Sequence, residues 1–228
     1  MNKMLTMLKL QQQLNDNTNG IGWEEGRTKQ GKIINWKRCI YLEAAELIES
    51  YPWKHWKSID AKVDYENVKI ELVDIWHFVM SEMLRVNKIE GDNLTIEELA
   101  NKAQNILDSI KVENVENNYY KQIEYIENFI KMLLCNFELD NFIKSYFELN
   151  YKLGLSFDEL YKLYIGKNIL NQFRQDNGYK DGTYIKVWNG REDNVVMQEI
   201  LDKNNNIKPD ELMNKLNEIY GDLKWNKS

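Results

Sequence analysis

The chain has 228 residues, 43% of them hydrophobic, and a net charge of −6. This composition excludes wholesale disorder and provides enough apolar surface for a buried core. The acidic balance argues against a nucleic-acid partner, although a small phosphorylated ligand needs only a local basic patch. Two prolines and 11 glycines leave long apolar-periodic stretches, which predict an all-α protein.

The cysteines and the N-terminus predict a cytoplasmic protein. Cys39 and Cys135 lie far apart in apolar surroundings, which is typical of reduced thiols in the cytosol. The apolar run at residues 4–8 is too short for a secretory signal. No segment has the run of about 18 apolar residues that spans a membrane. We therefore expect no membrane partner.

The apolar periodicity predicts helices along most of the chain. In chain order, we expect them over about residues 3–16, 35–50, 65–86, a dozen residues after Thr95, 119–149, a short stretch from Ser156, and 209–220. Thr95 and Ser156 are each followed three residues later by a glutamate, the pattern of a capping box. We expect a single domain over residues 1–228.

Two acidic pairs stand out within the helices expected in residues 35–86, Glu46-x-x-Glu49 and Glu71-x-x-Asp74. The spacing places both carboxylates of a pair on one side of a helix. Spacing alone is uninformative, because Glu124-x-x-Glu127 shows it on an ordinary amphipathic helix. The informative feature is that both pairs have apolar neighbours on nearly every side, which predicts buried helices whose carboxylates face inward.

Buried carboxylates need positive charge nearby. Divalent cations are the simplest source, and all-oxygen ligation suits Mg²⁺ or Mn²⁺. Such ions also shield phosphates and activate a bound water, so the acidic pairs indicate phosphate chemistry. A buried ion-pair network with Lys37 or Arg38 fits as well. His77 is either a partner of the metal ligands or a hydrogen-bonded core residue.

Residues 166–194 change to turns, aromatic residues and basic residues, and we expect a phosphate-binding segment there. The basic residues are Lys167, Arg174, Lys180, Lys186 and Arg191. Spaced by glycines and tyrosines, these side chains can converge on one triphosphate. The alternative is a structured surface loop with turns at Asn177-Gly178, Asp181-Gly182 and Asn189-Gly190.

A string of amides ends the first predicted helix. Gln12 and Asn15 share a helix face, and an amide offers the donors and the acceptor that a pyrimidine edge requires. A frayed polar helix end is the more common meaning of such a string. Trp53 and Trp56 either stack on a base or fill the core.

Taken in order, these segments resemble the all-α dimeric dUTPases, within the wider all-α NTP pyrophosphohydrolases that include the MazG type. The resemblance rests on four motifs: Gln12–Asn15, Glu46–Glu49 with Trp-Lys-x-Trp-Lys just after it, Glu71–Asp74, and Lys167–Tyr184 followed by Lys186 and Trp188. The last motif, Lys-Asn-x-Leu-Asn-x-Phe-Arg-Gln-Asp-Asn-Gly-Tyr-Lys-x-Gly-Thr-Tyr, is the most specific. Residues 87–160 add little to the resemblance.

The resemblance implies a helical bundle that hydrolyses dUTP, and also dUDP, to dUMP by metal-activated water. It implies a homodimer whose subunits share each site, and two or more Mg²⁺ ions for which Mn²⁺ can substitute. The implied metal ligands are Glu46, Glu49, Glu71 and Asp74. We assign Glu46 or Glu49 as the base that takes a proton from the attacking water. The implied uracil contacts are Gln12 and Asn15, to which we add Trp53 as a stacking candidate. The implied sugar and phosphate contacts are Lys167, Asn171, Arg174, Tyr179, Lys180 and Lys186.

Two alternatives to a dUTPase are a related pyrophosphohydrolase with another base preference, such as dCTP, and a nucleotide-binding module without activity. Turnover of a nucleotide panel with Mg²⁺ separates the three. Glu43 extends the acidic ridge three residues before Glu46, and the sequence leaves its role open.

Overall fold

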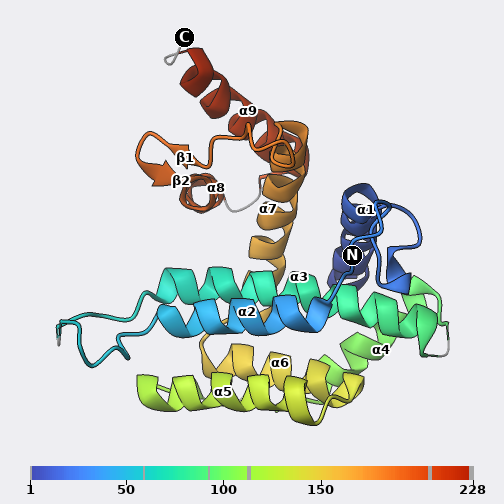
Figure 1. Ribbon diagram of the computed structural model, residues 1–228. Helices are drawn as coiled ribbons and strands as arrows, with labels where there is room; N and C mark the ends of the chain where they lie inside the picture. Colours follow the sequence, from blue (N-terminus) through green and yellow to red (C-terminus); the bar gives the residue numbers. More distant parts are fainter. Residues whose placement is uncertain (1, 59, 92, 112–113, 205–206, 226–228) are drawn as a thin grey trace. The chain divides into compact units, whose positions relative to one another are not determined.

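A computed structural model describes residues 2–58, 60–91, 93–111, 114–204 and 207–225, and most of these residues lie in helices (Figure 1). The predicted all-α class is confirmed. The elements are α1 (Lys3–Asn19), η1 (Trp23–Glu25), α2 (Trp36–Glu49), α3 (Tyr65–Ile89), α4 (Ile96–Asp108), α5 (Tyr119–Cys135), α6 (Leu139–Lys152), α7 (Phe157–Asp176), β1 (Val187–Trp188), β2 (Arg191–Glu192), α8 (Asp193–Lys203) and α9 (Pro209–Trp225).

The chain divides into two compact units, which we call the N-terminal unit (Met1–Leu160) and the C-terminal unit (Tyr161–Ser228). The predicted single domain over the whole chain stays a prediction. Among the described residues, no helix combines the length and the apolar character needed to cross a membrane.

Helix α3 is the centre of the N-terminal unit, because α1, α2 and α6 all pack against it. This position explains why α3 is apolar on nearly every side. Trp76 of α3 is fully buried and stacks on Tyr146 of α6, with ring centroids 4.9 Å apart. The Tyr146 hydroxyl donates to the carbonyl of Leu72, 2.9 Å away, so the aromatic pair is also tied to the α3 backbone. This packing fixes the helix that carries Glu71 and Asp74.

Local capping signals determine several helix ends. Thr95 and Glu98 form the predicted capping box, with the Thr95 amide 2.8 Å from the Glu98 carboxylate. The helix expected over 119–149 is instead two helices, because α6 starts at a new N-cap. The Glu138 carboxylate is that cap, and it accepts from the amides of Asp140 and Asn141. Glutamate is not among the usual capping residues, so no familiar capping signal marks this break.

The segment expected to be turns from Gly166 onward is helical as far as Asp176, so that boundary is wrong. Gly166 is a packing residue, since a Cβ there would lie 2.6 Å from the Leu201 side chain. The turns predicted beyond the helix are present. Asn189 and Gly190 both have positive φ and form the two-residue link between β1 and β2.

The C-terminal unit has an aromatic core. Four rings pack edge-on or stacked with centroids 5.2–6.4 Å apart, and they belong to Phe173, Tyr184, Trp188 and Tyr220. Trp188 is fully buried, and its indole N–H donates to the carbonyl of Ile185 at 2.7 Å. Aromatic residues of the basic segment therefore hold this unit together.

Candidate active site

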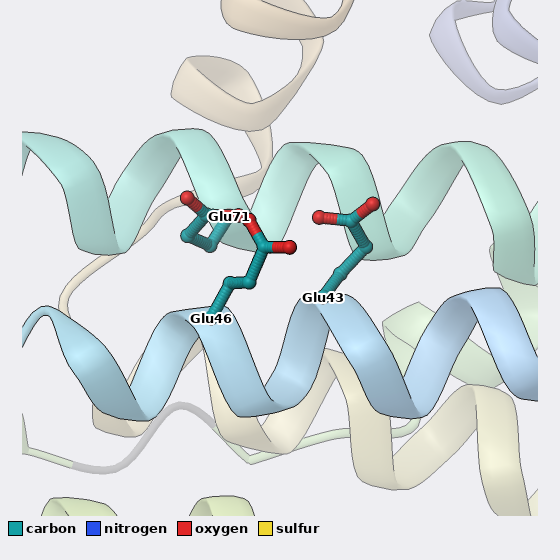
Figure 2. A group of neighbouring side chains, drawn as sticks. All are labelled: Glu43, Glu46 and Glu71. Atoms are coloured by element: carbon teal, nitrogen blue, oxygen red, sulfur yellow. The ribbon is translucent and has the colours of Figure 1, made fainter.

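Three carboxylates meet where α2 packs on α3. Glu43 and Glu46 reach from α2 toward α3, where Glu71 lies (Figure 2). One oxygen from each residue lies within 4.8 Å of those of the other two. Glu71 is buried, Glu43 is half-buried and Glu46 is exposed, so the group runs from the helix interface to the surface.

This carboxylate group suits a hard divalent cation. An ion held about 2.1 Å from each oxygen separates opposite ligands by about 4.2 Å. A 4.8 Å spread is close to that geometry, and small rotations of the exposed Glu46 side chain bring the oxygens nearer. Like charges this close repel, so a bound cation would stabilise the arrangement.

Glu71 is oriented by neighbours that sequence reasoning missed. The Asn67 amide donates to the Glu71 carboxylate at 3.2 Å and to the Ser50 hydroxyl at 2.9 Å. Asn67 lies one helical turn before Glu71, and Ser50 directly follows α2. The i, i+4 spacing of Asn67 and Glu71 was the available signal.

The other two predicted metal ligands lie outside this carboxylate group. Glu49 is exposed and forms an ion pair with Lys54. Asp74 is half-buried on α3, one turn after Glu71. The expectation that all four carboxylates face inward is wrong, because Glu46 and Glu49 are exposed.

The reason for this exposure is the rotation of α2 about its axis. The buried residues of α2 are Trp36, Ile40, Ala44 and Leu47. Each residue advances a helix by about 100°, so Glu49 lies about half a turn from Ile40 and points away from the core. Glu43 lies much closer to that buried stripe, which is why Glu43 rather than Glu49 joins Glu46 and Glu71.

A buried polar network joins α1 to α3. The Ser81 hydroxyl, fully buried, accepts from the amides of Gln11 and Asn15, each 3.0 Å away, and donates to the His77 carbonyl at 2.8 Å. Gln11 also donates to the Asn15 carbonyl at 3.2 Å, and its own carbonyl lies 2.8 Å from Nδ1 of His77. His77 is thus a hydrogen-bonded core residue, which was one of its two expected roles. Gln11 and Ser81 were not foreseen.

Gln12 has a different environment from Asn15. Its amide is partly buried and donates to Asp16 at 3.0 Å and to Glu24 at 3.1 Å. The Trp23 indole N–H also donates to Asp16, at 3.1 Å. Trp53 lies in the α2–α3 connection, 37% exposed, with the Trp56 ring edge-on at 5.6 Å. Only Asn15 of the predicted uracil contacts is therefore buried.

Arg174 in the C-terminal unit forms a buried ion pair. Its guanidinium donates two hydrogen bonds of 2.8 Å to the carboxylate of Asp193, which is fully buried. It also donates to Asn171 and to Asn194, each at 3.2 Å, and the Lys167 ammonium donates to Asn194 at 3.0 Å. Residues of α8 thus bring Lys167 and Arg174 together, and Arg174 in turn bonds Asn171 on its own helix.

The pKa values of this cluster follow from its contacts. Burial alone raises the pKa of the Asp193 carboxyl, but the hydrogen bonds and charge of Arg174 and the hydroxyl of Tyr184 outweigh it, and the pKa is lowered. Burial, and then the bond to Asp193, raises the pKa of Tyr184. The remaining predicted phosphate contacts, Tyr179, Lys180 and Lys186, are exposed, and Lys186 pairs with Glu192 at 3.2 Å.

A carboxylate group that suits a hard cation can serve metal-assisted hydrolysis of a phosphate ester or anhydride. A sequence model of the dUTPase family matches residues 3–179, more than half of the chain, and the chain belongs to that family. No curated protein matches it. The match supports the predicted activity, so the chain is an enzyme that hydrolyses dUTP, as the motifs indicated. Lys180, Lys186 and Asp193 lie beyond the matched residues.

Proposed function

We propose that the chain hydrolyses dUTP to dUMP and pyrophosphate with Mg²⁺ held between α2 and α3. The observation that carries this proposal is the meeting of Glu43, Glu46 and Glu71 within 4.8 Å. Carboxylate oxygens are the ligands of Mg²⁺, and Mn²⁺ accepts the same set. Glu49 and Asp74 complete a site for two or more ions in this proposal. Such ions polarise the phosphate and lower the pKa of a bound water.

Within this proposal the chain binds the cations, takes a proton from water and binds the base. Glu46 and Glu71 position the cations, and a carboxylate oxygen of Glu46 or Glu49 takes the proton from the attacking water. Gln12 and Asn15 pair with the uracil edge, and Trp53 stacks on the ring. Hydrolysis of dUDP to dUMP and phosphate follows from the same contacts, since the base and the scissile region are unchanged.

The proposed sugar and phosphate contacts are Lys167, Asn171, Arg174, Tyr179, Lys180 and Lys186. Their positive charges and hydrogen-bond donors support this role. The exposure of Tyr179, Lys180 and Lys186 leaves these three side chains accessible to a ligand. Two N–H groups of Arg174 already donate to Asp193. Arg174 therefore binds a phosphate either through its other N–H groups or after breaking the bonds to Asp193. We further propose that the chain acts as a homodimer in the cytoplasm.

The experiment is turnover of a nucleotide panel by the purified chain. We expect dUMP from dUTP and dUDP with Mg²⁺ or Mn²⁺, and no turnover with excess chelator. Turnover of dCTP in preference to dUTP would overturn the base assignment and leave the metal chemistry standing. Full turnover with chelator would overturn the metal. Sedimentation of the chain at assay concentration tests the dimer, and a single-chain mass in the active sample would contradict it.

A further inference from the structure

The polar network between α1 and α3 has a single possible hydrogen-bond direction. The Ser81 hydroxyl has one proton, which it donates to the His77 carbonyl at 2.8 Å. Its oxygen therefore accepts at both of its other positions. Two amides lie 3.0 Å from that oxygen, those of Gln11 and Asn15, and both must turn their NH₂ groups toward it.

The hydrogen-bond direction at Ser81 determines the direction of the other hydrogen bonds in the network. With the Gln11 NH₂ group at Ser81, its carbonyl faces His77, so Nδ1 of His77 is the donor across the 2.8 Å contact. The second N–H of Gln11 meets the Asn15 carbonyl at 3.2 Å. Turning the Asn15 amide over would set its oxygen against the accepting oxygen of Ser81 and its NH₂ against that of Gln11. The network thus starts and ends on His77, and it admits one orientation of each amide.

The geometry points to Ser81 as a positioning residue that determines base specificity by fixing the carboxamide of Asn15. This inference rests on the proposed pairing of Asn15 with the base. Asn15 is only 3% exposed, so water does not replace the hydrogen bonds that hold its amide in one orientation. One N–H and one lone pair of its amide are engaged in the network. These contacts take up the edge of the amide on which C=O and N–H point the same way, so the remaining N–H and lone pair point apart. A base meets one of these two groups, and the network fixes which one it is.

The orientation of the Asn15 amide matters because uracil and cytosine place donors and acceptors at opposite positions. Uracil presents an N3–H donor beside the O4 acceptor, whereas cytosine presents an N3 acceptor beside an N4 donor. An amide that turns freely pairs with either edge. In the proposed function, the held amide directs its remaining N–H to O4 of uracil, where cytosine places its N4 donor instead, and this favours dUTP over dCTP.

The test compares kcat/KM for dUTP and for dCTP in the full chain. We expect Ser81→Ala to lower the dUTP to dCTP ratio by about tenfold or more, because the Asn15 amide is released to turn. A purely structural defect lowers kcat/KM for both substrates by the same factor and leaves their ratio unchanged. Ser145→Ala is the control, since among the residues that the structure describes the Ser145 hydroxyl bonds the Phe142 carbonyl of its own helix, at 2.8 Å, and no other helix.

Two further measurements keep the inference open to disproof. Ser81→Cys leaves no cavity, because sulfur is larger than oxygen, but the thiol accepts hydrogen bonds only weakly. It therefore separates the loss of the hydrogen bonds from the loss of volume, and we expect the ratio to fall with it as well. Calorimetric binding of dUMP and dCMP to each variant repeats the comparison without turnover. A wild-type preference for dUTP that Ser81→Ala and Ser81→Cys leave unchanged would overturn the inference alone. A wild type that does not prefer dUTP would overturn the proposed base pairing and the inference together.

Discussion

Charge is arranged in opposite ways in the two units of the chain. The N-terminal unit gathers like charges, with oxygens of Glu43, Glu46 and Glu71 within 4.8 Å of one another. The C-terminal unit buries opposite charges, with Arg174 and Asp193 joined by two hydrogen bonds of 2.8 Å. Like charges repel and are relieved by a bound cation, whereas a buried bidentate pair satisfies itself.

This difference separates a binding site from a scaffold. Charges that a fold brings together against their own repulsion indicate a ligand of opposite charge. A buried pair of opposite charges indicates a structural role for Asp193, because removing either partner strands the other. We therefore expect substitutions at the ion pair to affect folding, and substitutions at the carboxylate group to affect turnover.

The largest expected effect is on the stability of the C-terminal unit. Asp193→Ala leaves the Arg174 guanidinium buried without its carboxylate, which costs about 3–5 kcal/mol in the free energy of unfolding. Urea unfolding followed by tryptophan fluorescence measures it, since Trp188 is fully buried in this unit. The matched control is Glu199→Ala, which removes a half-exposed pair with Arg191 and costs about 0–1 kcal/mol. Equal losses in the two variants would contradict a scaffold role for Asp193.

The second effect is on turnover in the N-terminal unit. Glu46→Gln removes a carboxylate charge from the group without changing its size, and we expect kcat/KM for dUTP to fall about 100-fold or more. Without divalent cations, the thermal stability of the variant should hold or rise slightly, because one of three repelling charges is gone.

Glu124→Gln makes the same chemical change on the exposed face of α5 and serves as the control. Its turnover should equal that of the wild type. If stability falls together with turnover in Glu46→Gln, Glu46 has a structural role. The proposed difference between the two units would then be wrong.

Local signals made much of this fold predictable. The Thr95 capping box and the Asn189-Gly190 turn depend only on residues close in sequence, and both are present. The break between α5 and α6 depends on an unusual N-cap. The helical conformation at Gly166 depends on packing against Leu201. Neither of these two features can be found by periodicity alone.

The sequence pointed to the acidic residues of α2 and α3, but not to the three that meet, Glu43, Glu46 and Glu71. Glu46-x-x-Glu49 and Glu43-x-x-Glu46 have the same spacing, and the choice between them depends on the rotation of α2. That rotation could have been inferred from the stripe of Ile40, Ala44 and Leu47. The contacts of Ser81 with Gln11 and Asn15 join residues 70 and 66 positions apart, and no local pattern predicts them.

A smaller effect is expected from pH on the C-terminal unit. The folded pKa of Asp193 lies below the ordinary carboxyl value of 3.8, so the stability from its ionised form is complete above pH 3.8 and is lost as pH falls below it. The folded pKa of Tyr184 lies above its ordinary value of 10.0, so the stability from its neutral hydroxyl is complete below pH 10.0 and is lost as pH rises.

The free energy of unfolding, measured by urea titration from pH 3 to 11, should therefore decline at both ends of this range. The decline is at most about 1.4 kcal/mol per pH unit for each proton. Tyr184→Phe should keep the acid decline and weaken the alkaline one. An alkaline decline of undiminished size in that variant would contradict the assignment to Tyr184.

The smallest effect decides whether Glu49 belongs to the metal site. Lys54 pairs with Glu49 at the surface, so Lys54→Gln should change the free energy of unfolding by less than about 1 kcal/mol. If Glu49 binds the cation, Lys54 competes with it, and removing Lys54 should lower the Mg²⁺ concentration for half-maximal activity by up to about fivefold. Lys57→Gln makes the same charge change at an exposed position of the same loop. Equal Mg²⁺ midpoints in the two variants would restrict the cation to Glu43, Glu46, Glu71 and Asp74, and would leave Glu49 as a surface partner of Lys54.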